Sequence, residues 1–193
     1  MISVIIPTIT GREESLARVM DAYRTRTSAE MEIVTVLDFP SWSAGCNAAE
    51  ASGDILHYGA DDLEPIEGWA DAMLGCLANG EIPAAQVWDF RQEGPCANEA
   101  QDGPAGALTV FSRVPSLTRE MAERIGPWPE FHYYADNWIA DKAHLLGYRV
   151  RVTAGYSFIH HWHPIGRLDD GDWVGRYLPL YNAERIKLGL GPV

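Results

Sequence analysis

The stretch ISVIIPTITGREESLARVMDAY, residues 2–23, opens the chain with the pattern of a strand followed by a helix. Residues 2–6 form a mostly β-branched run, which is typical of a strand buried on both faces of a parallel sheet. Apolar side chains then recur at helical spacing up to residue 23, with charges between them. Thr10 stands three residues before Glu13, and this spacing predicts a capping box at the start of the helix.

The alternation of strands and helices continues along the chain. We predict further strands at residues 32–37, 54–58, 83–90, 107–111 and 148–152. We predict helices at residues 46–52, 69–79, 117–125 and 133–147, and one more in the tail that starts at residue 169. Residues 91–106 are rich in Gly, Pro, Glu and Asn, and we expect them to form a mobile loop. This order predicts an α/β fold in one domain, residues 1–193, with a mostly parallel central sheet flanked by helices.

Composition argues against a nucleic-acid-binding, membrane-spanning or secreted protein. The net charge of -12 makes nucleic acid an improbable partner, because an acidic surface cannot neutralise a phosphate backbone. No apolar run is long enough to span a membrane. The three cysteines lack C-x-x-C spacing and the N-terminus lacks the pattern of a signal peptide, so we expect a cytoplasmic protein.

Acidic residues follow two of the predicted parallel strands at the point where each strand ends. Asp38 follows the second strand, and Asp61 and Asp62 follow the third. The first strand ends at Pro7 and Thr8. Because ligands of open parallel sheets bind at the carboxyl ends of the strands, these side chains are expected to share a site. Paired carboxylates suit Mg²⁺ or Mn²⁺ with open positions for phosphate oxygens, although the Asp61–Asp62 pair and Asp38, each taken in isolation, are more typical of solvated turns.

Two further groups could carry chemistry. Asp136 starts a predicted helix, where an acid is either a favourable first-turn residue or a general base. His160, His161 and His163 cluster after a strand, and imidazole is a ligand for Mn²⁺ or Zn²⁺. At β period His161 and His163 share a face that His160 opposes, and the sequence leaves open which of them binds a metal.

Four segments together resemble the family 2 glycosyltransferases, which are inverting nucleotide-sugar enzymes with the GT-A fold. They are SVIIPTITGREESLARVMDAY, EIVTVLD, CNAAEASGDILHYGADD and LTREMAERIGPWPEFHYYADNWIADKAHLLGYRVRV. The resemblance runs from Ser3 to about His163, and the combination with ADNW and LLGYRVRV is its more specific part.

The resemblance implies a reaction and a set of roles. The reaction is metal-dependent transfer of a sugar, with Mn²⁺ or Mg²⁺, from a nucleotide diphosphate sugar (UDP-sugar as first choice) to a hydroxyl acceptor. Residues 1–65 would form the nucleotide-binding half, residues 83–165 the acceptor half and residues 169–193 a helical tail. The implied donor-binding residues are Pro7, Thr8, Asp38, Asn47 and Asp61. The implied metal ligands are Asp61 with His160 or His161, and the implied catalytic base is Asp136.

The chain departs from the family pattern at three points. Gly59 stands where the first acid of the metal motif is usual, Cys46 stands where an arginine is common, and the segment between Asp38 and Asn47 is short. The Gly59 departure is the best support for an alternative, a non-catalytic nucleotide-sugar-binding module of the same fold. A zinc hydrolase built on the histidines is a weaker alternative, because no H-E-x-x-H spacing is present.

Overall fold

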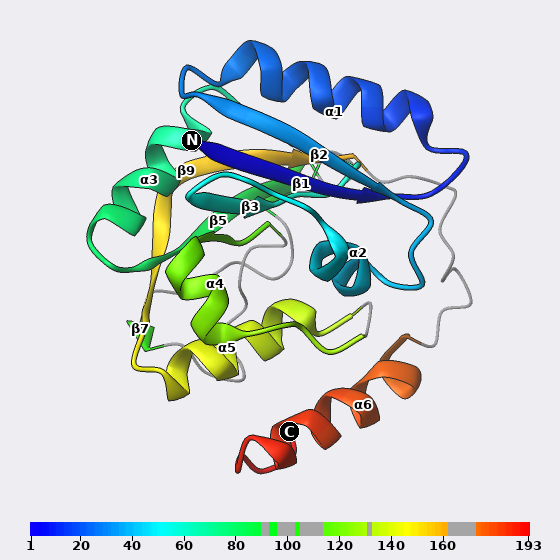
Figure 1. Ribbon diagram of the computed structural model, residues 1–193, viewed down its shortest axis with the longest axis vertical. Helices are drawn as coiled ribbons and strands as arrows, with labels where there is room; N and C mark the ends of the chain where they lie inside the picture. Colours follow the sequence, from blue (N-terminus) through cyan, green and yellow to red (C-terminus); the bar gives the residue numbers. More distant parts are fainter. Residues whose placement is uncertain (90–92, 96–102, 105–113, 131–132, 162–172) are drawn as a thin grey trace.

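The computed structural model describes residues 1–89, 93–95, 103–104, 114–130, 133–161 and 173–193 (Figure 1). The strands are β1 (Ile2–Thr8), β2 (Met31–Leu37), β3 (Ile55–Tyr58), β4 (Leu63–Pro65), β5 (Ile82–Asp89), β6 (Gly94–Pro95), β7 (Gly103–Pro104), β8 (Ser116–Thr118) and β9 (Arg149–His160). The helices are α1 (Glu13–Arg26), α2 (Trp42–Ala48), α3 (Trp69–Ala78), α4 (Arg119–Ile125), α5 (Ala135–Leu145) and α6 (Trp173–Lys187).

The strands form two hydrogen-bonded sheets. The first has the order β2-β1-β3-β8, and the second has the order β4-β9-β5-β6, with β7 also paired to β9. The long pairings, β1 with β2 and β5 with β9, are parallel, whereas the short strands β4, β6, β7 and β8 pair antiparallel. The prediction of an α/β fold with mostly parallel pairing is confirmed.

Helices cover both faces of the first sheet, which explains the apolar sequence of β1. Val4 and Ile6 point into a core formed with α1 and α3, while Ile5 points into a second core formed with α2, α4 and α5. Figure 1 shows α1 on one side of this sheet and α2, α4 and α5 on the other. A strand buried on both faces therefore stands at the centre of the molecule.

Several predicted boundaries were wrong. The strand predicted at 148–152 extends to His160, and the predicted helix at 46–52 lies at Trp42–Ala48. Strands β4 and β8 were missed. The strand predicted at 107–111 lies outside the described residues, as does most of the loop predicted at 91–106.

The predicted capping box is absent. Arg12, not Thr10, is the N-cap residue of α1, and no side chain caps that helix. Thr10 donates instead to Asp38, through its backbone N–H (3.0 Å) and its hydroxyl (2.7 Å). Thr10 therefore bonds to Asp38, at the end of a neighbouring strand, and does not cap the helix as its spacing predicts.

The C-terminal helix packs back on the domain, as predicted for the tail. In α6, Tyr181 (2.7 Å) and Arg185 (2.6 Å) both donate to the buried Asp141 carboxylate of α5. The Tyr181 ring also stacks on Tyr134 at 5.1 Å between centroids. This buried charge pair fixes the position of α6, because breaking it would leave an unpaired charge in the interior.

A neutral histidine lies in the centre of the core. The His57 ring of β3 is fully buried, with Tyr23 Oη 2.9 Å from Nε2 and Ser116 Oγ 2.7 Å from Nδ1. Burial lowers the pKa of His57 to about 3. Both ring nitrogens are hydrogen-bonded within the protein, which is a structural role.

His57 makes the stability of the fold depend on pH. Between pH 6.5 and about 3 the unfolded state binds a proton that the folded state does not, so stability falls as pH falls through this window. We expect the free energy of unfolding to lose about 2 kcal/mol to this residue between roughly pH 7 and pH 5.

Urea unfolding of the wild type and of His57→Gln at both pH values measures this contribution. Glutamine retains hydrogen-bonding groups but does not titrate, so the variant should show the shallower pH dependence. The same pH dependence in both proteins would contradict the prediction.

Candidate functional site

A buried carboxylate, Asp61, joins the ends of three elements. The residue is 2% exposed and follows β3. Thr8, the last residue of β1, donates its hydroxyl to Oδ2 at 2.5 Å, and Arg12 donates from a guanidinium nitrogen to Oδ1 at 2.6 Å. Ser15 of α1 donates to the Asp61 carbonyl at 2.6 Å. Burial raises the pKa of the Asp61 carboxyl, while the Thr8 hydrogen bond and the Arg12 charge act in the opposite direction.

Asp38 lies at the same edge of the sheet. Its backbone N–H donates to the Thr8 carbonyl at 3.0 Å, and its carboxylate accepts both hydrogen bonds from Thr10. Asp38 has a φ of 59°, a left-handed conformation in which Asp is tolerated. The side chain remains exposed. Thr8, Asp38 and Asp61 therefore meet at the carboxyl ends of β1, β2 and β3, as the sequence predicted.

Pro7 and Asn47 contribute to this region through packing and backbone contacts. A Cβ on Gly45 of α2 would lie 2.9 Å from the Pro7 Cβ, so α2 abuts the end of β1. The Asn47 amide donates to the Trp128 carbonyl (2.7 Å), and its oxygen accepts from the Trp128 N–H (2.9 Å). Both polar atoms of this side chain thus bind the segment that precedes α5.

Two stacked indoles form a bridge from the Asp61 loop to that segment. Trp42 donates its ring N–H to the Gly59 carbonyl at 2.9 Å and stacks on Trp128, with 4.8 Å between ring centroids. Ser43 donates to the Pro129 carbonyl at 2.8 Å. Helix α2 therefore holds the nucleotide-binding half of the sequence prediction against the acceptor half.

The two described histidines of the cluster face different partners. His160 Nε2 lies 3.6 Å from an Asp62 carboxylate oxygen, and its Nδ1 lies 3.9 Å from the buried Asp89. His161 Nε2 lies 2.9 Å from a Glu64 oxygen. Burial lowers the pKa of His161, and nearby Arg18 lowers it further, against the effect of Glu64. His163 lies outside the described residues.

The predicted metal ligands do not converge on one ion. Among the described residues, no group of three His, Cys, Asp or Glu side chains is arranged to hold a metal. Both oxygens of Asp61 are bound by Thr8 and Arg12, and His161 contacts Glu64. His160 and Asp62 could still contribute two ligands to a metal ion, because an imidazole and a carboxylate face each other there.

Asp136 lies in the first turn of α5, half-buried, where its carboxylate accepts from the Asn137 N–H at 3.0 Å. Burial raises the pKa of the adjacent Tyr134, and the Asp136 charge raises it further. A backbone hydrogen bond in the first turn of α5 therefore orients the Asp136 carboxylate. Its role as a base stays a prediction.

Sequence reasoning missed Arg12, Glu64 and Asp89. The Glu64 carboxylate, which lies next to α1, contacts three side chains: Arg26 at 2.7 Å, Arg18 at 3.7 Å and His161 at 2.9 Å. The signal for Arg12 was weak, because a charged residue before a helix is usually solvated. Arg12 could have been predicted from Asp61, because a buried acid requires a cationic partner.

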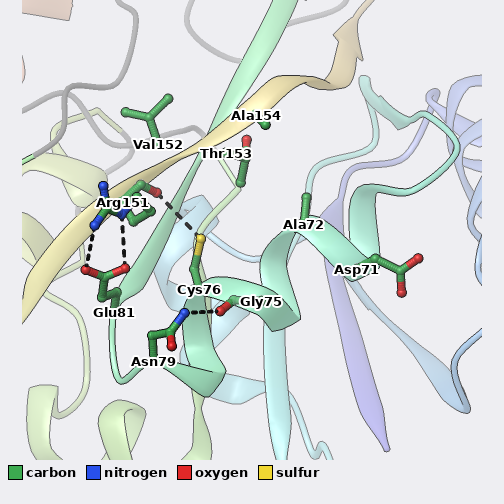
Figure 2. A pocket seen from close by; sticks show the side chains of 10 residues that line it. All are labelled: Asp71, Ala72, Gly75, Cys76, Asn79, Glu81, Arg151, Val152, Thr153 and Ala154. Atoms are coloured by element: carbon green, nitrogen blue, oxygen red, sulfur yellow. Dashed lines mark hydrogen bonds and ion pairs between the residues drawn. The ribbon is translucent and has the colours of Figure 1, made fainter.

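A hollow of about 610 Å³ is lined by residues other than the acids and histidines described above. Figure 2 shows its lining residues. It lies between α3 and the first half of β9, where Arg151 binds Glu81 at 3.1 Å. The acids and histidines described above adjoin the far end of β9, around His160. The hollow therefore does not coincide with the predicted site.

No family model and no curated protein matches the chain. Solved glycosyltransferase structures do. TarS 1–349 of S. aureus superposes over 96% of this chain with a TM-score of 0.70 at 14% identity, and its complex with UDP-GlcNAc gives 0.72. The mannosyltransferase PcManGT of Pyrobaculum calidifontis, in complex with GDP-Man and Mn²⁺, superposes over 99% with a TM-score of 0.67 at 16% identity.

The protein therefore has a GT-A-like glycosyltransferase fold. It spans 65% of the TarS 1–349 and PcManGT chains, and 39% of the longer TarS chain. Within the described residues, no helix is both long and apolar enough to cross a membrane.

The contacts of Asn47 predict a measurable structural role. Asn47→Ala removes both hydrogen bonds to the Trp128 backbone, so we expect it to lower the free energy of unfolding by about 1–3 kcal/mol. Asn79→Ala is the matched control, because Asn79 is exposed like Asn47 but its side chain donates to Gly75 of its own helix. Urea unfolding compares the two, and equal effects would contradict the bridging role of Asn47.

Proposed function

We propose that the protein is a glycosyltransferase that moves a sugar from a nucleotide diphosphate sugar to a hydroxyl acceptor. The observation that supports this most is the meeting of Thr8, Asp38 and the Asp61–Arg12 pair at the carboxyl ends of β1, β2 and β3, in a GT-A-like fold. Ligands of parallel sheets bind at this edge. The structural neighbours in complex with UDP-GlcNAc, UDP and GDP-Man support the same donor class.

The proposed reaction inverts the anomeric centre. Asp136 removes the proton from the acceptor hydroxyl as the oxygen forms its bond to the anomeric carbon. The bond from that carbon to the diphosphate oxygen breaks, and the nucleoside diphosphate leaves with the electron pair. Cationic groups beside the diphosphate stabilise the charge that develops on it. A UDP-sugar is the proposed donor.

The proposed division of labour follows the sequence prediction. Residues 1–65 bind the nucleotide, residues 83–165 carry the acceptor side, and residues 169–193 contribute the tail helix. Asn47 bonds to the Trp128 backbone through both amide atoms. It would therefore affect donor binding indirectly, by holding the nucleotide-binding half against the acceptor half. Pro7 would act by shaping the end of β1.

The sequence also predicts that the sugar transfer depends on a divalent metal ion. Mn²⁺ is present in the PcManGT complex. Here the predicted set of Asp61, His160 and His161 does not assemble, so an ion would have to rely on Asp62 and His160 together with phosphate oxygens. The proposed steps therefore do not pass through an ion.

A non-catalytic nucleotide-sugar-binding module remains the alternative, and Gly59 at the place of the first acid favours it. The alternative predicts that nucleotide sugars bind without any release of nucleotide. Thermal-shift screening of UDP-sugars and GDP-sugars, followed by assay of nucleotide release with hydroxyl acceptors, separates the two functions.

The catalytic assignment predicts the behaviour of Asp136→Asn. An amide is a poor base, so turnover should fall by about 10²–10⁴-fold while donor affinity is unchanged. Asp71→Asn is the matched control, since it changes an exposed first-turn acid of another helix. Near-normal turnover in Asp136→Asn would remove this residue from the role of base.

A further inference from the structure

One guanidinium serves two carboxylates at the predicted donor site. An Arg12 nitrogen lies 2.6 Å from Asp61 Oδ1 and 3.8 Å from Asp62 Oδ2. The Asp61 side chain is almost fully buried, whereas 17% of the Arg12 side chain is exposed. The Arg12 guanidinium therefore lies beside Asp61, an implied metal ligand, and 3.8 Å from the neighbouring Asp62, and the Arg12 side chain as a whole is partly exposed.

An ion that bridged Asp61 and Asp62 would have to take the place of this guanidinium. Both oxygens of Asp61 already accept hydrogen bonds, from Thr8 and Arg12. Removing the arginine from a buried carboxylate is costly, because it leaves an uncompensated charge in a medium of low dielectric. The arrangement thus favours a protein cation over a bound metal at Asp61.

The site also lacks other features on which a metal-dependent donor site would draw. Gly59 replaces an acid and Cys46 replaces an arginine in the pattern that the chain resembles. Cys46 is buried and has a raised pKa because of that burial, so it is a neutral thiol. Arginine has a planar fork of donors that matches phosphate oxygens, and its charge is permanent.

We propose that Arg12, positioned by Asp61 and Thr8, contacts the donor diphosphate in place of a divalent ion, so that nucleotide binding does not require metal. This inference rests on the proposed function. Asp61 is then a positioning residue: its carboxylate holds the guanidinium at the edge of the sheet where Thr8 and Asp38 also lie.

Calorimetric titration of UDP and GDP into the full chain, in EDTA and in Mn²⁺, tests the inference. The wild type should bind the same nucleotide with similar affinity in both. Arg12→Gln should weaken binding in EDTA by about 10- to 100-fold, the loss expected for a charge-assisted hydrogen bond. Mn²⁺ should restore part of that loss, because Asp61 and Asp62 then lack their cation and form a site for one.

Two further variants distinguish binding from folding. Arg12→Lys keeps the charge and should retain more affinity than Arg12→Gln. Arg26→Gln removes a cation from the same helix that pairs with Glu64, and it should leave nucleotide affinity unchanged. Thermal melts of each variant establish that it is folded.

Two results would overturn the inference alone: wild-type binding that requires Mn²⁺, or a folded Arg12→Gln with unchanged affinity in EDTA. The second result would make the Arg12–Asp61 pair purely structural. Absence of any nucleotide binding by the wild type under both conditions would instead overturn the proposed function, and the inference with it.

Discussion

The buried carboxylate of Asp61 is the constraint on which the carboxyl-end edge of the first sheet depends. A charge removed from water must be paired and hydrogen-bonded, and Asp61 obtains its partners from Thr8 and Arg12. Ser15 adds a bond to the backbone of the same residue. The end of β1, the start of α1 and the loop after β3 therefore cannot move independently. The hydrogen bonds and the ion pair that Asp61 requires therefore hold these three segments in fixed positions.

The aromatic bridge extends this constraint to the other half of the chain. Trp42 binds the Gly59 carbonyl two residues before Asp61, and its ring stacks on Trp128. The Asn47 amide then fixes the Trp128 backbone. Indole rings bury a large apolar area while their N–H groups satisfy polar partners, so one short helix, α2, can join two regions far apart in sequence. The segment that leads to Asp136 is thereby tied to the Asp61 loop.

The features that sequence could predict are those fixed by local pattern. The buried run of β1 and the helical spacing of α1, α3 and α5 report periodicity directly, and acids at the ends of parallel strands meet because strand geometry requires it. Features that depend on distant partners could not be predicted. Thr10 has the spacing of a helix cap but bonds to Asp38, and β9 continues past an irregular region near Gly155, with a φ of 68°, where sequence predicts an end.

The site shows the same division. That His160 and His161 face opposite ways follows from strand period, but their partners, Asp62 and Glu64, become known only when β4 pairs with β9. Arg12 was overlooked for the same reason. Nothing local distinguishes an arginine that is solvated before a helix from one that reaches an acid 49 residues away.

Net charge proves to be a poor guide to the electrostatics of this site. The chain carries a formal charge of -12, which suggests an unfavourable field for an anionic donor. Yet the buried acids are paired within the protein: Asp61 with Arg12, Glu64 with Arg26, and Asp141 with Arg185. Exposed acids are screened by salt over about 10 Å, whereas buried charges act at short range with little screening. At the carboxyl ends of β1 and β3 the local field is therefore set mainly by Arg12 and the two carboxylates near it, Asp61 and Asp62, and not by the net charge of the chain.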